Sequence, residues 1–242
     1  MARRRPIGKP IRDGLTRADI TVEGIRQRVR DQGFEKFFPF LDDDERERRR
    51  QETLARLRPG EGLWVFGYGS LMWNPAFEST EIRSGLVHGY HRQFCLWTPI
   101  GRGTPECPGL MLALERGGAC RGLAMHIAPE KVENESRVIW LREMLSGAYH
   151  AVWVTVRTDR GKVPAVTFVI NREHQQYAGG VSRDDTVKAL ATAAGQLGRA
   201  RDYLHNLVLH LDELGLRDGP MHRLYDEVER YADAVPDGAD GS

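Results

Sequence analysis

Two features of the sequence could do chemistry together: a glycine-rich turn and a carboxyl group at the end of a helix. The turn spans residues 67–70, Gly-Tyr-Gly-Ser, and follows the apolar residues Trp64–Phe66. This pattern predicts a buried strand that ends in a tight turn, where glycines allow backbone conformations that other residues avoid. Backbone N–H groups of such a turn can converge on one point, and that point would bind a carboxylate or a developing oxyanion.

The carboxyl group is that of Glu143, which falls in the last turn of a predicted helix, where the helix dipole disfavours a negative charge. It lies three residues after Trp140 and four after Ile139, on the apolar stripe of that helix. Burial and the dipole would both raise its pKa, and a carboxyl group tuned toward neutral pH can accept a proton and return it. The position equally suits a glutamate paired with Arg137 or Arg142, and the pattern leaves both interpretations open.

Other common sites do not fit the sequence. Met72 stands where the third glycine of a dinucleotide-binding motif belongs, and Ser70 lacks the flanking glycines of a nucleophile elbow. The eight histidines are scattered, and the three cysteines have no C-x-x-C spacing. We therefore expect no metal, no cofactor and no disulfide framework, and we expect a reducing, cytoplasmic location.

The overall charge and hydropathy narrow the choice of partners. The net charge is +1, so no global field attracts nucleic acid or a membrane surface. No apolar run reaches the roughly 18 residues of a membrane span, and the basic start of the chain has no apolar stretch behind it that would make a secretory signal. We expect a small-molecule substrate, neither nucleic acid nor membrane as a partner, and a monomer or weak homo-oligomer.

Residues 1–60 form a predicted Arg-rich, partly helical extension. Acids precede bases over residues 42–50, which predicts a helix that starts near Asp42 and carries ion pairs one turn apart. The alternative of a basic nucleic-acid arm is weakened by the neighbouring acids, which cancel most of the charge. That arm would be Arg3, Arg4 and Arg5. The extension also contains an aromatic cluster, which we expect to dock on the main domain or on a second subunit: Phe34, Phe37, Phe38 and Phe40.

Residues 61–232 form the predicted catalytic domain, and 233–242 a disordered tail. Strands come first, one helix interrupts them, and helices finish the domain, which favours an α+β fold with a mixed, curved or barrel-like sheet and flanking helices. Gly117-Gly118 is interpreted as a hairpin turn. The predicted strands are 63–67, 86–97, 109–115, 119–127, 151–158 and 163–170, and the predicted helices run from Pro129 to before Gly147, from Ser182 to about Gly195, over Arg201–Leu214 and, briefly, from Pro220.

Several motifs, in order from about Trp64 to Asp218, resemble the glutathione-specific γ-glutamylcyclotransferases, the ChaC-like family. The first is the strand and turn F-G-Y-G-S-L followed by W-N-P. The others are Gly89–Trp97, Arg102–Pro105 with Pro108-Gly109, Arg142-Glu143 with Gly147-Ala148-Tyr149, Gln176–Gly179 and Asp202–Leu204. The first 60 residues lie outside this resemblance.

The resemblance implies a γ-glutamylcyclotransferase-like fold and an enzyme that converts glutathione to 5-oxoproline and Cys-Gly, which makes it a carbon–nitrogen lyase of glutathione catabolism. It implies that Glu143 is the catalytic acid and base. Tyr149 and Tyr177 are either substrate contacts or core tyrosines. The γ-glutamyl group would bind the turn and its flanks, which are Val65, Phe66, Gly67, Tyr68, Gly69, Ser70 and Leu71.

Two departures from the family pattern bear on the substrate. Ala148 and His150 stand where family members often have glycine and arginine, and Gly195–Gly198 lacks the proline and serine of a family turn. The alternatives are therefore the same chemistry on other γ-glutamyl amines or amino acids, or a non-catalytic γ-glutamyl-binding protein. Retention of both the turn and Glu143 argues against pure binding, which has no use for a proton shuttle.

Overall fold

The computed structural model describes residues 17–31 and 40–234, and the chain divides into two compact units. One unit, here called the barrel unit, contains residues 15–97 and 111–180; the other, the helical unit, contains residues 98–110 together with the C-terminal region from residue 181. The predictions for Arg3–Arg5, Phe34, Phe37 and Phe38 concern residues outside the described ranges. The predicted division at residues 60 and 232 stays a prediction.

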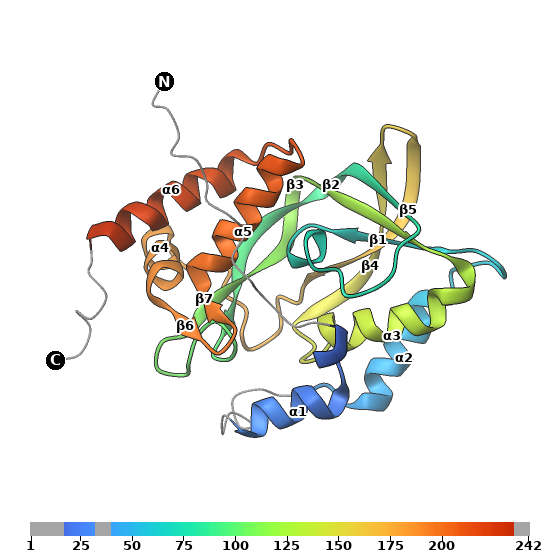
Figure 1. Ribbon diagram of the computed structural model, residues 1–242, viewed down its shortest axis with the longest axis horizontal. Coiled ribbons are helices and arrows are strands. Elements are labelled where there is room, and N and C mark those ends of the chain that lie inside the picture. The colour runs from blue at the N-terminus through green and yellow to red at the C-terminus, as the bar shows by residue number, and fades with distance from the viewer. Residues whose placement is uncertain (1–16, 32–39, 235–242) are drawn as a thin grey trace. The chain divides into compact units, whose positions relative to one another are not determined.

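The barrel unit is built on a closed five-stranded sheet, which confirms the predicted α+β class with a barrel-like sheet (Figure 1). The strand order is β1-β3-β2-β4-β5. The barrel closes because β1 runs parallel to β5 at Val65 and Val166, and β3 runs parallel to β5 at Leu114 and Val169. The strands are β1 Leu63–Gly67, β2 Glu81–Thr98, β3 Gly109–Ile127, β4 Tyr149–Thr158 and β5 Gly161–Ile170.

The predicted hairpin at Gly117-Gly118 is wrong. Residues 109–127 form one continuous strand, β3, in which the two glycines have φ of 101° and 69°. One end of β3 pairs with β1, from Leu123 to Ile127, and the other end reaches β5. A strand that serves two neighbours must curl around the barrel, and left-handed glycines let it bend without ending it.

Helices of the barrel unit precede and interrupt the strands. The helix predicted near Asp42 is present as α2, Asp43–Leu54, and Asp42 caps it by accepting from the backbone N–H groups of Asp44 and Glu45. The helix predicted from Pro129 begins as the 3-10 turn η3, Pro129–Lys131, and continues as α3, Val132–Glu143, beside α2 (Figure 1). The remaining pieces are η1 Arg17–Asp19, α1 Val22–Asp31 and η2 Ser70–Met72.

The helical unit contains the three predicted C-terminal helices. Ser182 caps the first of them as expected, because its Oγ accepts from Asp185 N at 3.1 Å. That helix ends at Thr192 rather than near Gly195, and the last helix has 16 residues rather than being short. The elements are α4 Arg183–Thr192, β6 Ala194–Gly195, β7 Gly198–Arg199, α5 Ala200–Glu213 and α6 Gly219–Ala234.

Candidate active site

The glycine-rich turn follows directly from β1, as predicted. Phe66 is fully buried, and its carbonyl accepts a hydrogen bond from Thr167 Oγ1 at 2.9 Å. A Cβ at Gly67 would come within 2.8 Å of Met125 Cε, and a Cβ at Gly122 would overlap the Gly67 carbonyl oxygen. The backbone of the turn therefore lies against β3 at a distance that requires glycine at position 122, whereas at position 67 the nearest atom is the end of a flexible methionine side chain.

Beyond Gly67 the chain turns into the short 3-10 helix η2. Within this turn, Met72 N donates to Gly69 O at 2.9 Å and Asn74 N donates to Ser70 O at 2.8 Å. These bonds hold the backbone of η2 in a tight turn directly after the glycines.

Arg92 on β2 supports this turn from within the barrel unit. Its side chain is 4% exposed, its Nε donates to Tyr68 O at 2.6 Å, and its Nη2 donates to Arg121 O. Hydrogen bonds from a charged, buried guanidinium are strong, so those from Arg92 hold the backbone of the turn in place. The sequence places Arg92 in the Gly89–Trp97 motif but does not indicate that it contacts the turn.

Glu143 is the last residue of α3, as predicted. Its side chain is 16% exposed, and burial raises the pKa of the carboxyl group above its ordinary value, while the positive charge of Arg142 partly opposes this. Arg142 Nε lies 3.3 Å from Glu143 Oε1, whereas Arg137 pairs with Glu133 at 2.7 Å. Glu143 therefore has an arginine neighbour and, because of burial, a raised pKa, and its role as a proton carrier stays a prediction.

Arg142 also connects the helix to the glycine-rich turn. Its Nη2 donates to Ser70 Oγ at 2.8 Å, and its Nη1 donates to the carbonyl oxygen of Asn74. One guanidinium therefore contacts both Glu143 and Ser70, which are 73 positions apart in the chain. The structure thus brings the two chemical features of the sequence together. Arg142 was expected only as a possible partner of Glu143, and the reach to Ser70 has no sequence signal.

Tyr149 and Tyr177 share another part of the barrel unit, with Cys95, Leu96, Ala113, Ala148 and Ile170. Tyr149 donates its hydroxyl proton to Leu112 O at 3.1 Å. Tyr177 donates to Glu115 Oε2 at 2.6 Å, and this hydrogen bond raises the pKa of the tyrosine. A hydroxyl has one proton, so in this arrangement each tyrosine could meet a substrate only as an acceptor.

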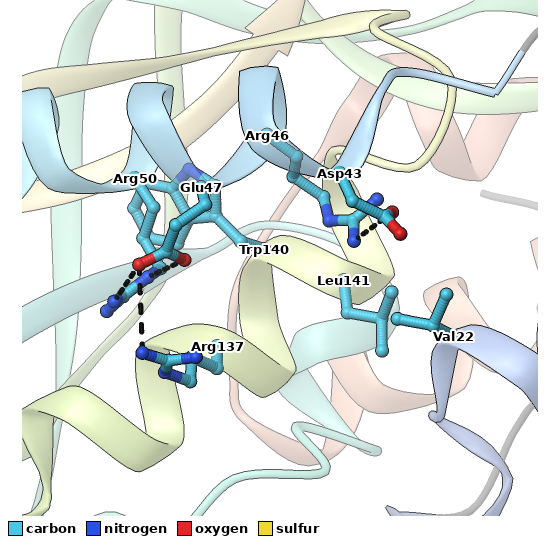
Figure 2. Close-up of a pocket in the computed structure, with 8 residues that line it drawn as sticks. All are labelled: Val22, Asp43, Arg46, Glu47, Arg50, Arg137, Trp140 and Leu141. Atoms are coloured by element: carbon cyan, nitrogen blue, oxygen red, sulfur yellow. Dashed lines mark hydrogen bonds and ion pairs between the residues drawn. The ribbon is translucent and has the colours of Figure 1, made fainter.

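A pocket of about 330 Å³ is lined by residues of α1, α2 and α3. Figure 2 shows that its charged side chains point toward one another: Arg46 pairs with Asp43 at 2.7 Å, and Glu47 lies between Arg50 and Arg137. Val22, Trp140 and Leu141 supply its apolar lining. Because these charges already pair with one another, we interpret the pocket as a packing interface between helices rather than a ligand site.

The described part of the chain contains neither a metal-binding cluster nor a helix suited to a membrane. Within residues 17–31 and 40–234, no three His, Cys, Asp or Glu side chains are placed to hold a metal ion. None of the helices described there combines the length and apolar composition needed to cross a membrane.

The barrel and its flanking helices have the fold of a γ-glutamyl cyclotransferase. A crystal structure of a yeast γ-glutamyl cyclotransferase specific to glutathione superposes with a TM-score of 0.65 and 21% sequence identity, over 72% of this chain and 98% of that chain. The family model for ChaC-like proteins matches residues 63–231. The chain therefore belongs to the ChaC-like protein family.

Named relatives agree with this assignment. The glutathione-specific gamma-glutamylcyclotransferase of Escherichia coli K12 is 41% identical over 189 residues, which cover 77% of this chain and 81% of that protein. The gamma-glutamylcyclotransferase 2-3 of Arabidopsis thaliana is 32% identical over 69% of this chain and 88% of its own length. The glutathione-specific gamma-glutamylcyclotransferase 1 of Mus musculus is 30% identical over 72% of this chain and 78% of its own length.

Proposed function

We propose that this protein is a glutathione-specific γ-glutamylcyclotransferase that converts glutathione to 5-oxoproline and Cys-Gly. The observation that carries the proposal is the position of Glu143, a largely buried carboxyl group linked through Arg142 to Ser70 of the glycine-rich turn. The fold and the 41% identity to the Escherichia coli enzyme support the choice of reaction and substrate.

The substrate supplies its own nucleophile. The α-amine of the γ-glutamyl unit attacks its δ-carbonyl carbon, a C–N bond forms to close the five-membered ring, and the bond to the cysteine nitrogen breaks. A site that folds the γ-glutamyl chain so that amine and carbonyl meet contributes several kcal/mol through orientation, on the order of 7 or more in well-aligned cases. The scheme therefore needs no serine or cysteine nucleophile from the enzyme.

Glu143 moves the proton in both steps. An α-ammonium group has no lone pair, so Glu143 first accepts a proton from it, and the protonated carboxyl group then gives that proton to the departing cysteine nitrogen. The ring nitrogen loses its second proton as the lactam forms, and the amine of Cys-Gly takes up that proton and leaves as an ammonium group. The pKa of Glu143 is raised by burial, which makes the carboxylate a stronger base and brings its titration closer to neutral pH. Arg142 keeps the side chain beside Ser70 and limits how far the pKa rises.

Attack on the carbonyl creates an oxyanion, and the turn at residues 67–71 supplies its donors in this mechanism. In this proposal the backbone N–H groups of Gly67–Leu71 are the candidates, and the bonds of Met72 N and Asn74 N hold the turn in shape. One fixed donor of this kind typically contributes about 3 kcal/mol to the transition state. Val65 and Phe66 anchor the turn in the barrel core, where both are fully buried.

Tyr149 and Tyr177 are proposed to contact the substrate as hydrogen-bond acceptors. Both hydroxyl protons are committed to protein oxygens, so in this proposal the hydroxyl oxygens act as acceptors for substrate N–H groups. The two altered positions nearby differ in accessibility: Ala148 is buried, whereas His150 is exposed. His150 could therefore change how a substrate carboxylate is held, while Ala148 fills space in the core.

We place the reaction in the cytoplasm, with the protein acting as a monomer or weak homo-oligomer on a small molecule. The cysteines support a reducing compartment, because Cys95, Cys107 and Cys120 are all free thiols. Two of them are buried, and burial raises the pKa of the Cys95 thiol to about 12, which keeps it unreactive.

Release of 5-oxoproline by the purified protein tests the proposal. Glutathione, γ-glutamyl amino acids and γ-glutamyl-lysine amides are compared at equal concentration. Release from glutathione alone is expected. Release only from the others would assign the same chemistry to a different γ-glutamyl amine. The name of the Arabidopsis relative, gamma-glutamylcyclotransferase 2-3, does not specify glutathione. No release from any of them would leave a γ-glutamyl-binding protein.

A further inference from the structure

We infer that residues 17–31 and 40–54, which precede the family match at 63–231, position the helix that carries Glu143, and that Arg50 is the main positioning residue. The inference rests on the proposed role of Glu143. It concerns how that residue is held and adds no group that touches the substrate. Arg50, Arg17 and Leu41 make contacts with α3 and with the residues just after it.

The first contact is made by Arg50 of α2, whose side chain is 1% exposed. It donates to Ser136 Oγ at 2.7 Å and to Glu133 Oε1 at 2.8 Å, both on α3, and it also pairs with Glu47 at 2.7 Å. The hydrogen bond from Arg50 lowers the pKa of Glu47 to about 2, so this network remains ionised at neutral pH. Figure 2 shows Arg50 and Glu47 pointing from α2 toward α3.

The second contact lies near the start of α3. Both terminal nitrogens of Arg17 donate to Glu135, with Nη2 at 2.9 Å from Oε1, and Glu135 also accepts from Glu78 N at 3.0 Å. The third contact follows the end of the helix, where Leu41 N donates to Leu145 O at 2.8 Å. Leu145 is only two residues after Glu143, so the extension holds the chain on both sides of that carboxyl group.

The geometry of the helix explains why these contacts would affect Glu143. Ser136, Trp140 and Glu143 are spaced four and three residues apart and so lie along one face of α3. A rotation of the helix that follows loss of the bond at Ser136 would therefore carry Glu143 with it. Trp140 packs edge-on against Phe168 of β5, with ring centroids 5.3 Å apart, so α3 would stay attached to the barrel while it turns.

The test replaces Arg50 by methionine and by lysine in the full-length protein, with Arg48→Met as the matched control. Arg48 lies on the same helix but is 55% exposed and pairs with Glu45 and Glu52, both also on α2. Measurements are kcat and KM for 5-oxoproline release, the pH profile, and the titration of the Glu143 side chain by ¹³C NMR. Titration gives a readout that does not depend on turnover.

For Arg50→Met we expect kcat to fall about tenfold or more, with KM changed less than about twofold, because the misplaced group is the proton carrier. The pKa of Glu143 should fall toward its ordinary value as water reaches the helix end. Loss of a positive charge alone would raise that pKa. The direction of the pKa change therefore distinguishes a positioning effect of Arg50 from an effect of its charge. Arg50→Lys should restore part of kcat, and Arg48→Met should match the wild type.

A folded Arg50→Met variant with wild-type kcat and an unchanged or raised Glu143 pKa would overturn the inference. If Arg50→Met does not fold, Arg17→Met serves instead, since that side chain is 46% exposed, and it should shift both readouts in the same direction by a smaller amount. If the wild type releases no 5-oxoproline from any substrate, the proposed function fails, and the NMR titration still decides the inference.

Discussion

Arg142 and Ser70 are joined by a hydrogen bond of 2.8 Å between side chains that are 72 positions apart in the chain. The same guanidinium lies 3.3 Å from the Glu143 carboxyl group, so the position of the acid and the position of the turn are set by one residue. A proton carrier and a set of oxyanion donors must keep a fixed separation during the reaction. In the proposed mechanism, Arg142 keeps that separation through its side-chain contacts with Ser70 and Glu143.

Replacement of Glu143 by glutamine removes the proton carrier and keeps the shape of the side chain. We expect kcat for 5-oxoproline release to fall by about 10² to 10⁴, the usual contribution of a positioned acid or base. Binding of glutathione, measured by calorimetry, should change little. Turnover near the wild-type rate would contradict the mechanism, and loss of binding would show that the carboxyl group holds the ground state instead.

The pH profile should respond to Arg142 in a defined direction. Its positive charge lowers the pKa of Glu143, so Arg142→Met should raise that pKa and move the acidic limb of kcat/KM to higher pH. Arg142→Lys keeps the charge and should leave the limb closer to its wild-type place, although the contact with Ser70 is lost. Arg48→Met is the control, because Arg48 pairs with Glu45 and Glu52 on α2 rather than with Glu143.

Stability should depend on pH through Glu143. Its pKa in the folded protein is above the ordinary value of 4.5, so the folded state binds the proton more tightly than the unfolded chain. The stability that this provides is fully present below about pH 4.5 and is lost as the pH rises through the folded pKa. The Tm of Glu143→Gln should therefore rise relative to that of the wild type as the pH increases. A difference in Tm that stays constant with pH would exclude this linkage.

The two tyrosines can be separated by a matched pair of variants. Tyr177→Phe removes a hydrogen bond to Glu115, a carboxyl group that Arg172 also contacts at 2.7 Å, so the charge stays paired. Tyr149→Phe removes a bond to a backbone carbonyl. If the hydroxyls accept from the substrate, each variant should raise KM by about fivefold to tenfold, which corresponds to one hydrogen bond of roughly 1 to 1.4 kcal/mol. An unchanged KM with a lower Tm would make them core residues.

Local signals in the sequence predicted much of this architecture. Gly67 marks the end of β1, Asp42 and Ser182 cap helices where they were expected, and Glu143 stood out because a carboxyl group rarely ends a helix on its apolar side. Each of these features depends on residues within about one helical turn of one another. Local chemistry decides them, so a single sequence is enough.

Features that depend on distant pairing could not be predicted. The pair Gly117-Gly118 suits a hairpin and a bent strand equally well, and only the partners of β3 on both sides select the bend. Likewise, nothing near Arg142 or Arg92 in the chain indicates that the first reaches Ser70 and the second reaches Tyr68. These contacts exist because the barrel closes, and closure is a property of the whole sheet.

The close approach of β3 to the turn gives a final prediction. A Cβ at Gly122 would overlap the carbonyl oxygen of Gly67 and come within 2.8 Å of Phe66 Cζ, so Gly122→Ala must move the turn or the strand. We expect a loss of about 1 to 3 kcal/mol of stability and a kcat that falls more than stability alone explains, because the displaced backbone carries the oxyanion donors. Gly180→Ala is the control, since a Cβ there meets nothing within 4 Å. Equal Tm and kcat for the two variants would show that the turn tolerates displacement and that its donors are not held in place by β3.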